Sequence, residues 1–536
     1  MTYSVVTFAP VQSFIRASRK LRDLYGSSLL LSHLAKALAD DAAGRGLAVI
    51  SPASVQGSRG VPNVLVIAGD YRKGHARDAL LASWKGVLQV CRQWLEKVMP
   101  ETDFDWDSSW KACAQHTWEL FHGQGATIAE ARRALAVNKL QRAWSVPNWT
   151  GESSSLSSAE AVVWPRMGQV IDPRHLDHQA AQSEARQFLQ VLRQSLGQAF
   201  AGEKEELSLN ELVKRLVTYK PIAEKLDLQI PEHFDKTSML TTADNDTSES
   251  IIWFMADGDS IGAHLETMAG KRGEAEALQS FSAGMRAWAA DLYQQVPAVM
   301  NDKALVVYAV GDDVFGALHE SLPGRRDLTA ADLWRWLAEF PRLWQGCGQE
   351  NLTVSMGLVW ADSKVPQREA LQHARDAEAS AKARGRNRFA LRLLYANGNH
   401  LEWTCPWSWL EPIRSHYRDR EGRGGERANW RHLADDLAWL RSRQAIASNP
   451  RAPSTTSATA IATQNTALAL WQAYFPGCSL SPERDRTAPE STAFRATLQT
   501  PEEGGRRFDQ WLHDLGRVLA AVEKWNIGSA IKEFAR

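Results

Sequence analysis

The order of predicted strands and helices between residues 251 and 394 constrains the fold more than any other feature of this chain. The segments in order are a dense apolar strand at 251–255, a helix at 274–295, strands at 304–310, 314–318 and 352–360, an alanine-rich helix at 369–384 and a strand at 389–394. Apart from the additional strand at 352–360, this is the β-α-β-β-α-β order that is typical of a ferredoxin-like fold.

Acidic residues follow two of these strands. Asp257-Gly258-Asp259 comes directly after the first strand, and Asp312 and Asp313 occupy the tight turn of the hairpin. Because the first strand and the hairpin are neighbours in this fold, we expect their carboxylates to meet at one sheet edge. Carboxylates so close repel each other unless a cation compensates, and Mg²⁺ prefers such oxygen ligands. A two-metal site of this kind activates a ribose hydroxyl and stabilises a leaving pyrophosphate.

Each acidic motif also has a simpler interpretation. Gly-Asp is a favoured hairpin turn, and Asp257-Gly258-Asp259 fits a polar loop between a strand and a helix. The two motifs occur in the expected order, however, with a predicted helix between them, and that coincidence favours a shared site.

Positive charge lies at the end of the helix predicted at 369–384. Lys382 and Arg386 are suited to hold a triphosphate, as a point charge and as a planar fork. The alternative is that cations near a helix C-terminus favour the helix dipole and precede a glycine cap, here Gly385.

The rest of the chain indicates a second α+β block and two helical segments. A strand at 3–8, a long helical pattern after Pro10, a strand at 63–68 and a helix at 78–98 predict a small α+β domain. We therefore predict an α+β protein in which the same plan, α/β then helices, is duplicated. The predicted domains are 1–135 (α+β), 136–245 (helical), 246–400 (α+β, with the acidic motifs) and 401–536 (helical, with mobile loops). Polar stretches at 237–250, 418–427, 448–463 and 482–505 read as a linker and mobile loops.

Composition excludes several classes of protein. Lys plus Arg and Asp plus Glu both number 62, which rules out a bulk basic nucleic-acid binder. The 5 Cys are widely spaced and odd in number, which argues against a disulfide framework or zinc ribbon. No secretory leader or membrane-length apolar run is visible, so we expect a cytoplasmic protein. The 22 Trp suggest wide packing surfaces against other domains or chains.

The basic cluster of Arg16, Arg19, Lys20 and Arg22 is interpreted as a solvated helix face or a phosphate contact.

Six short motifs follow one another along the chain, at residues 9–32, 60–63, 257–262, 309–313, 353–357 and 381–387. Together they resemble the landmarks of the polymerase-like large subunit of type III-B (Cmr) CRISPR effector complexes. The resemblance implies two ferredoxin-like palm (nucleotide cyclase-like) domains, each with a helical companion. It also implies that the second palm converts ATP into cyclic oligoadenylate when the complex, with its other subunits and guide RNA, holds target RNA.

The resemblance assigns roles to particular residues. Asp257, Asp312 and Asp313 would be catalytic ligands of two Mg²⁺ or Mn²⁺ ions. Lys382 and Arg386 would bind the triphosphate, and Gly311 would let the hairpin backbone approach the nucleotide. The remaining substrate-binding positions would be Gly258, Asp259 and Ser260 in the second palm, and Gln12, Ser13 and Ser27 at the mouth of the first palm near a second ATP.

The chain departs from the family pattern in three respects. Val310 stands where the family has its first hairpin Gly, and a Val side chain would narrow the pocket or extend the backbone. The HD nuclease domain, which would precede Met1, and the zinc-binding cysteines have no counterpart, so we expect no DNase activity. Two alternatives stay open: an inactive palm scaffold of the same complex, and a synthase that joins AMP to another small molecule.

Overall fold

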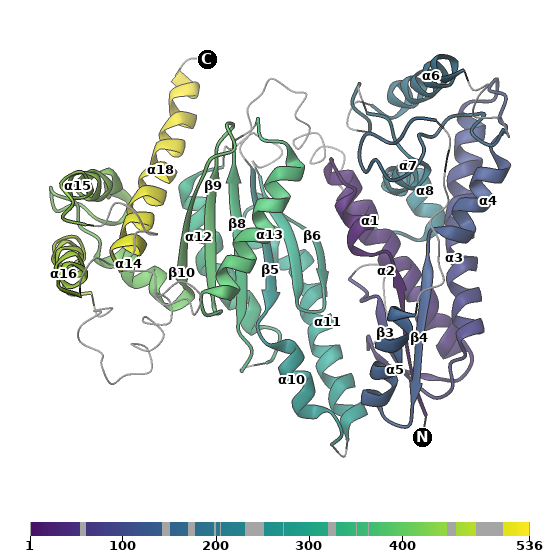
Figure 1. Ribbon diagram of the computed structural model, residues 1–536, viewed down its shortest axis with the longest axis horizontal. Coiled ribbons are helices and arrows are strands. Elements are labelled where there is room, and N and C mark those ends of the chain that lie inside the picture. Colours follow the sequence, from purple (N-terminus) through teal and green to yellow (C-terminus); the bar gives the residue numbers. More distant parts are fainter. Residues whose placement is uncertain are drawn as a thin grey trace. The chain divides into compact units, whose positions relative to one another are not determined.

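The chain divides into two compact units in the computed structural model shown in Figure 1. The first comprises residues 1–246, 262–292 and 307–311, and the second comprises 247–261, 293–306 and 312–536. The structure describes residues 2–534 except 54–59, 142–148, 150, 170–176, 198–199, 204, 231–250, 272, 320–327, 350, 363, 447–456 and 479–507.

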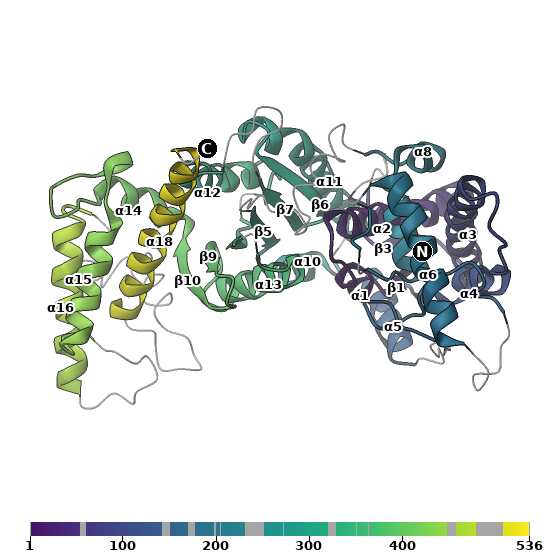
Figure 2. The same ribbon diagram turned by 90° about the horizontal axis from the view of Figure 1, so that it is seen from above.

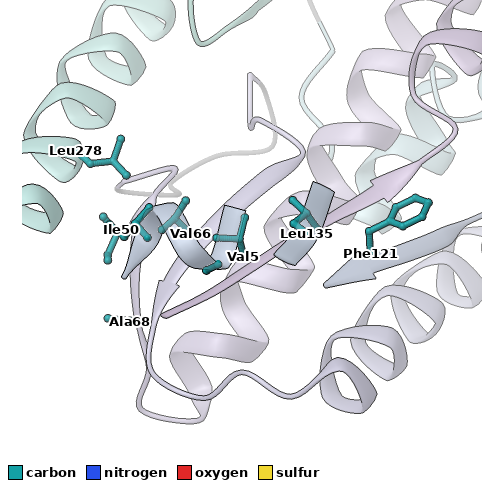
Figure 3. Close-up of a cluster of buried hydrophobic side chains, with 9 residues drawn as sticks. Val5, Ile50, Val66, Ala68, Phe121, Leu135 and Leu278 are labelled. Atoms are coloured by element: carbon teal, nitrogen blue, oxygen red, sulfur yellow. The ribbon is translucent and has the colours of Figure 1, made fainter. Parts of the chain in front are cut away.

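The first unit contains a four-stranded antiparallel sheet. Its strands are β1 (Tyr3–Ala9), β2 (Ala48–Ser51), β3 (Val64–Ala68) and β4 (Glu119–Gly125), in the order β2-β3-β1-β4. Alternate positions of β1 and β3 point to one core, in which Val5 and Val66 pack with Phe121 of β4 (Figure 3). Leu278 of α11 (Glu274–Val299) belongs to the same cluster.

Helices surround this sheet. They are α1 (Gln12–Arg16), α2 (Leu21–Gly44), α3 (Lys73–Val98), α4 (Asp107–His116), α5 (Ile128–Leu140), α6 (His178–Leu196), α7 (Leu209–Leu216), α8 (Lys220–Ala223) and α10 (Ile261–Met268). A buried ion cluster joins α2 to α7: Arg215 Nε lies 2.6 Å from Asp23 Oδ1, and its Nη1 lies 2.7 Å from Glu205 Oε2. Charges this deeply buried need full pairing, so the cluster fixes one packing of the two helices.

A six-stranded sheet has the order β10-β9-β8-β5-β7-β6, and all of it except residues 307–310 of β6 belongs to the second unit. The strands are β5 (Ile251–Gly258), β6 (Ala304–Val310), β7 (Asp313–Leu318), β8 (Val354–Ala361), β9 (Arg388–Leu394) and β10 (His400–Pro406). The run β6-β7-β5-β8 repeats the run β2-β3-β1-β4 of the first sheet, so the predicted duplication of a ferredoxin-like strand order is confirmed. Strand β9 adds parallel to β8, and β10 adds antiparallel to β9.

Two helices cover opposite faces of this sheet, as Figures 1 and 2 show: α12 (Ala330–Gln345) and α13 (Gln367–Ala383). On the α12 face, the rings of Phe254 and Trp336 lie 4.4 Å apart. On the α13 face, a Cβ at Gly357 would lie 2.3 Å from the backbone of α13, so only glycine permits this close approach. Residues 255, 257 and 259 share the α13 face because side chains alternate along a strand.

The C-terminal part packs through aromatic side chains. Its helices are α14 (Leu410–His416), α15 (Trp430–Ser442), α16 (Ser457–Tyr474) and α18 (Phe508–Phe534), with 3₁₀ segments at Trp407–Trp409 and Gly425–Arg427. Trp511 of α18 contacts Trp403 and Trp409, and its Nε1 donates to Thr404 O at 2.8 Å. At least fourteen of the 22 Trp are buried within the chain. These side chains therefore pack segments of the chain against one another, as Trp511 does with Trp403, and contact of Trp side chains with other chains stays a prediction.

The mixed α/β fold class predicted from the sequence is confirmed, with differences in detail. The sequence pattern missed β2, β4 and β10, which are short or rich in polar residues. The predicted loop at 448–463 is wrong from residue 457 onward, where α16 begins, and 482–505 and 237–250 lie outside the described residues. The four predicted domain boundaries stay predictions.

Candidate active site at the end of strand β5

The end of β5 meets the β6–β7 hairpin turn. The β5–β7 pairing runs to Ala256 opposite Val314, so the same register places Asp257 beside Asp313 and Gly258 beside Asp312. A Cβ at Gly258 would lie 2.9 Å from Asp312 Cβ, which shows how closely the two chain segments approach. The predicted meeting of the two acidic motifs therefore occurs within the second unit.

The hairpin carboxylates lie where ionisation is disfavoured. Burial raises the pKa of Asp312 to about 6, and the neighbouring charge of Asp313 adds to the rise. Burial also raises the pKa of Asp313 to about 6. Two carboxyl groups that resist ionisation at one strand end are a feature of functional sites, where a cation or substrate supplies the missing compensation.

Lys382 of α13 is the cation that this corner contains. Its Nζ donates a short hydrogen bond to Asp257 Oδ2, and it lies 2.8 Å from Glu378 Oε1, four residues earlier on the helix. Burial and the nearby Arg386 lower the pKa of Lys382. The close approach of α13 at Gly357 brings Lys382 within reach of β5. The structure thus places Lys382 beside the acidic motifs. The spacing of residues in the sequence alone did not decide whether it lies there.

Glu378 is a member of this corner that the sequence interpretation missed. Burial raises its pKa to about 7, and the charges of Asp313 and Asp259 contribute to the rise. The available signal was its position four residues before Lys382, which puts both side chains on one face of a helix. Adjacent acidic residues on that helix obscured it.

Asp259 faces into the protein. The residue is 3% exposed, and its carboxylate accepts hydrogen bonds from Thr353 Oγ1, Ser355 Oγ and the backbone N–H of Asn387 at 2.7, 2.7 and 2.8 Å. Ser260 follows with a φ of 61°, where the chain turns from β5 into α10. Gly311 has a φ of 64° at the hairpin turn, with open space where a side chain would be.

Helix α13 ends in a glycine cap. Gly385 N–H bonds to Lys382 O and Arg386 N–H bonds to Ala381 O, both at 3.3 Å, which is the Schellman arrangement. The capping interpretation of this segment is therefore confirmed, and it is compatible with a ligand role because Arg386 is exposed just beyond the cap.

The residues predicted at the mouth of the first palm lie in the first unit. Gln12 and Ser13 are exposed on α1, and Ser13 lines a cavity of about 750 Å³. Ser27 is fully buried, and its hydroxyl donates to Asp23 O at 2.6 Å within its own helix.

The basic cluster on the first helix was interpreted as a solvated helix face. That interpretation is wrong for Lys20 and Arg22, which are 5% and 4% exposed.

The oxygen donors at the end of β5 decide whether this corner suits divalent cations. Among the described residues, no group of three or more His, Cys, Asp or Glu is arranged to hold a metal ion. Asp257 is paired with Lys382 instead. The donor chemistry nevertheless fits Mg²⁺ or Mn²⁺, because the carboxyls of Asp312 and Asp313 are hard oxygen ligands whose mutual repulsion a cation would relieve.

Two sheets share a ferredoxin-like strand order, and the second carries this corner of acidic and basic residues at the end of β5. Two segments of the chain match protein-family models. Residues 251–390 match Cas10/Cmr2, second palm domain, and residues 3–58 match CRISPR-associated protein Cmr2, N-terminal. These two segments of the chain thus match the Cas10/Cmr2 family models, and the resemblance seen in the sequence is confirmed for them. The comparison with curated proteins gave no match.

Solved structures match this chain at low sequence identity, and the first of those below has a TM-score above 0.5. A type III-B Cmr-beta structure in the apo state is 11% identical, over 98% of this chain and 81% of that chain, with a TM-score of 0.57. A Csm1–Csm4 cassette in complex with cA4 is 15% identical, over 97% and 70%, with a TM-score of 0.47. Csm1 of T. onnurineus is 14% identical, over 97% and 69%, with a TM-score of 0.45. Within the described part of this chain, no helix has the length and apolar character needed to cross a membrane.

Proposed function

We propose that this chain is the nucleotidyl-transferring subunit of a type III CRISPR RNA-guided complex, and that it converts ATP into cyclic oligoadenylate when the complex binds target RNA. The observation that carries the proposal is the convergence of Asp257, the Asp312-Asp313 turn and Lys382 in one corner of a Cas10/Cmr2 palm domain. The other subunits, the guide RNA and the target RNA are its proposed partners.

The acidic residues have the role of holding two Mg²⁺ or Mn²⁺ ions. When bound, such ions activate the attacking ribose hydroxyl and stabilise the departing pyrophosphate. Asp257, Asp312 and Asp313 supply the carboxylate oxygens.

The basic residues bind and orient the triphosphate. Lys382 already lies against Asp257, so its ammonium group is placed where phosphate oxygens and the acidic corner meet. Arg386 projects from the turn just beyond the helix cap and has the planar fork suited to phosphate. Because positioning provides most of the catalysis in phosphoryl transfer, both side chains act by fixing the in-line geometry.

The hairpin turn accommodates the departure from the family pattern. Val310 is the last residue of β6 and is half-buried, and Gly311 alone carries the left-handed conformation of the turn. The single glycine that the turn geometry requires is therefore retained, so Val310 does not remove the turn that presents Asp312 and Asp313.

The test is incubation of the assembled complex with labelled ATP, Mg²⁺ and target RNA, with mass spectrometry of the products. We expect 3′–5′ or 2′–5′ linked cyclic oligoadenylate, lost in the double variant Asp312→Ala, Asp313→Ala. Asp291→Asn, an exposed carboxylate on α11, serves as the matched control and should leave product formation unchanged.

Other products would correct the proposal in defined ways. AMP joined to another small molecule would keep the site and change the acceptor. No product at all, together with full immune function of the double variant, would make the chain a palm scaffold.

A further inference from the structure

We propose that Asp259 is a positioning residue that holds the phosphate turn, defined here as residues 384–387, in the shape that presents Lys382 and Arg386. The inference rests on the proposed function for the phosphates themselves. It assigns to the second carboxylate of the Asp-Gly-Asp motif a role different from that of the first.

The contacts of Asp259 point inward and not toward a ligand. Oδ1 accepts from Ser355 Oγ at 2.7 Å, and Oδ2 accepts both from Thr353 Oγ1 at 2.7 Å and from Asn387 N–H at 2.8 Å. Its own N–H donates to Thr353 O at 2.8 Å. At 3% exposure the carboxylate is closed off by these donors, so it links the end of β5 to the start of β8 and to the phosphate turn.

The phosphate turn needs such a restraint because of its backbone. Gly385, Arg386 and Asn387 have φ values of 119°, 62° and 49°. For the two residues that carry a Cβ, the left-handed region costs on the order of 1 kcal/mol each, and it persists only where surrounding contacts enforce it.

Asp259 is a charged acceptor for the backbone N–H of Asn387 in this turn. Elsewhere in the turn, Arg384 pairs with Glu402 at 2.9 Å and Arg388 Nε donates to Arg386 O at 2.9 Å, whereas Asn387 O accepts from the neutral Trp407 N–H at 3.3 Å. A hydrogen bond to a carboxylate is roughly twice as strong as a neutral one. We therefore expect Asp259 to be the main restraint on the conformation of Asn387.

Losing this restraint affects both phosphate-binding side chains. The Schellman bonds of Arg386 and Gly385 close the last turn of α13, and Lys382 lies in that turn. If Asn387 relaxes to negative φ, Arg386 leaves its position and the helix end that carries Lys382 frays. Asp259 thus acts on substrate binding through the turn and makes no contact with substrate itself.

The experiment compares two variants that distinguish a positioning residue from a metal ligand. In Asp259→Asn the amide oxygen can still accept from Asn387 N–H while the amide nitrogen donates to Ser355 Oγ, so the turn is largely kept. In Asp259→Ala every acceptor is lost. A metal ligand would be damaged by both changes, because neither variant carries a charge.

Two readouts are measured. In the assembled complex we expect the KM for ATP to rise about tenfold to a hundredfold in Asp259→Ala and to stay within about tenfold of the wild type in Asp259→Asn, with kcat largely retained in the latter. In the full chain without nucleotide, we expect amide hydrogen exchange at residues 385–388 to speed up about tenfold or more in Asp259→Ala. Ser355→Ala, which removes only the bond to Oδ1, is the matched control and should leave this exchange unchanged.

The outcomes are decisive for Asp259 separately from the proposed function. Unchanged amide hydrogen exchange at residues 385–388 in Asp259→Ala overturns the inference. The inference also fails if Asp259→Asn and Asp259→Ala both lose kcat to the same extent. If Asp259→Ala fails to fold, the retained kcat of Asp259→Asn decides the question. If the wild-type complex forms no product, the proposed function fails while the exchange measurement still tests the turn.

Discussion

Replacing Asp312 by asparagine should stabilise the fold at neutral pH while removing catalysis. Burial and the charge of Asp313 raise the pKa of Asp312 from 3.8 to about 6, which means that the folded chain binds this proton more tightly than the unfolded chain does. The resulting penalty on the folded state is absent below pH 3.8, grows as the pH rises, and is complete above about pH 6. Asparagine cannot ionise, so it escapes the penalty.

The magnitude follows from the shift. A rise of about two pKa units corresponds to about 3 kcal/mol when one unit is about 1.4 kcal/mol. Asp312 is half-buried, and solvent screening reduces the expected gain to about 1–2 kcal/mol. For a unit of this size that amounts to a few degrees in melting temperature.

The assay is chemical and thermal unfolding of the full chain at pH 4 and pH 7.5 in the presence of a chelator. We expect Asp312→Asn to exceed the wild type at pH 7.5 and to match it at pH 4, whereas the exposed Asp291→Asn control should show no difference at either pH. If Asp312→Asn is no more stable than the wild type at pH 7.5, the reasoning is refuted. The negative charge of Asp312 would then be balanced by other groups of the folded chain.

Three further predictions concern the same corner. Lys382→Ala should raise the KM for ATP about tenfold or more in a steady-state assay, and exposed Lys364→Ala should not; equal effects would mean a general charge effect. Gly357→Ala should destabilise the second unit by about 1–3 kcal/mol in urea melts, since its Cβ would lie 2.3 Å from two backbone atoms of α13; wild-type stability would contradict the close approach. Affinity for Mg²⁺, measured by calorimetry, should fall as the pH drops through about 6, where Asp312 and Asp313 take up protons; a flat profile between pH 5 and 8 would count against them as ligands.

The second sheet was predictable because its strands carry their own signals. The apolar run before Asp257 and the Gly-Asp turn between two β-rich segments fix strand, turn and neighbour order locally. Short strands such as Ala48–Ser51 and polar ones such as Glu119–Gly125 lack those signals, and they form because a neighbouring strand offers an edge.

The site was predictable only in part. Alternation along β5 correctly implies that Asp257 and Asp259 share a face, but it says nothing of what each meets there. Asp257 meets Lys382 and Asp259 meets Asn387, and both partners arrive from beyond residue 380 through the packing of α13. The burial of Lys20 and Arg22 was likewise invisible, because their partners lie on segments that the first helix meets only in three dimensions.

The ion pair between Lys382 and Asp257 has a thermodynamic consequence for ligand binding. In the proposed site, a divalent cation would compete with this ammonium group for the carboxylate of Asp257, and a triphosphate would compete with Asp257 for Lys382. Triphosphate at Lys382 would leave Asp257 open to metal, and metal at Asp257 would leave Lys382 open to phosphate. By linkage each ligand then strengthens the binding of the other by the same factor, and ATP and Mg²⁺ should load cooperatively.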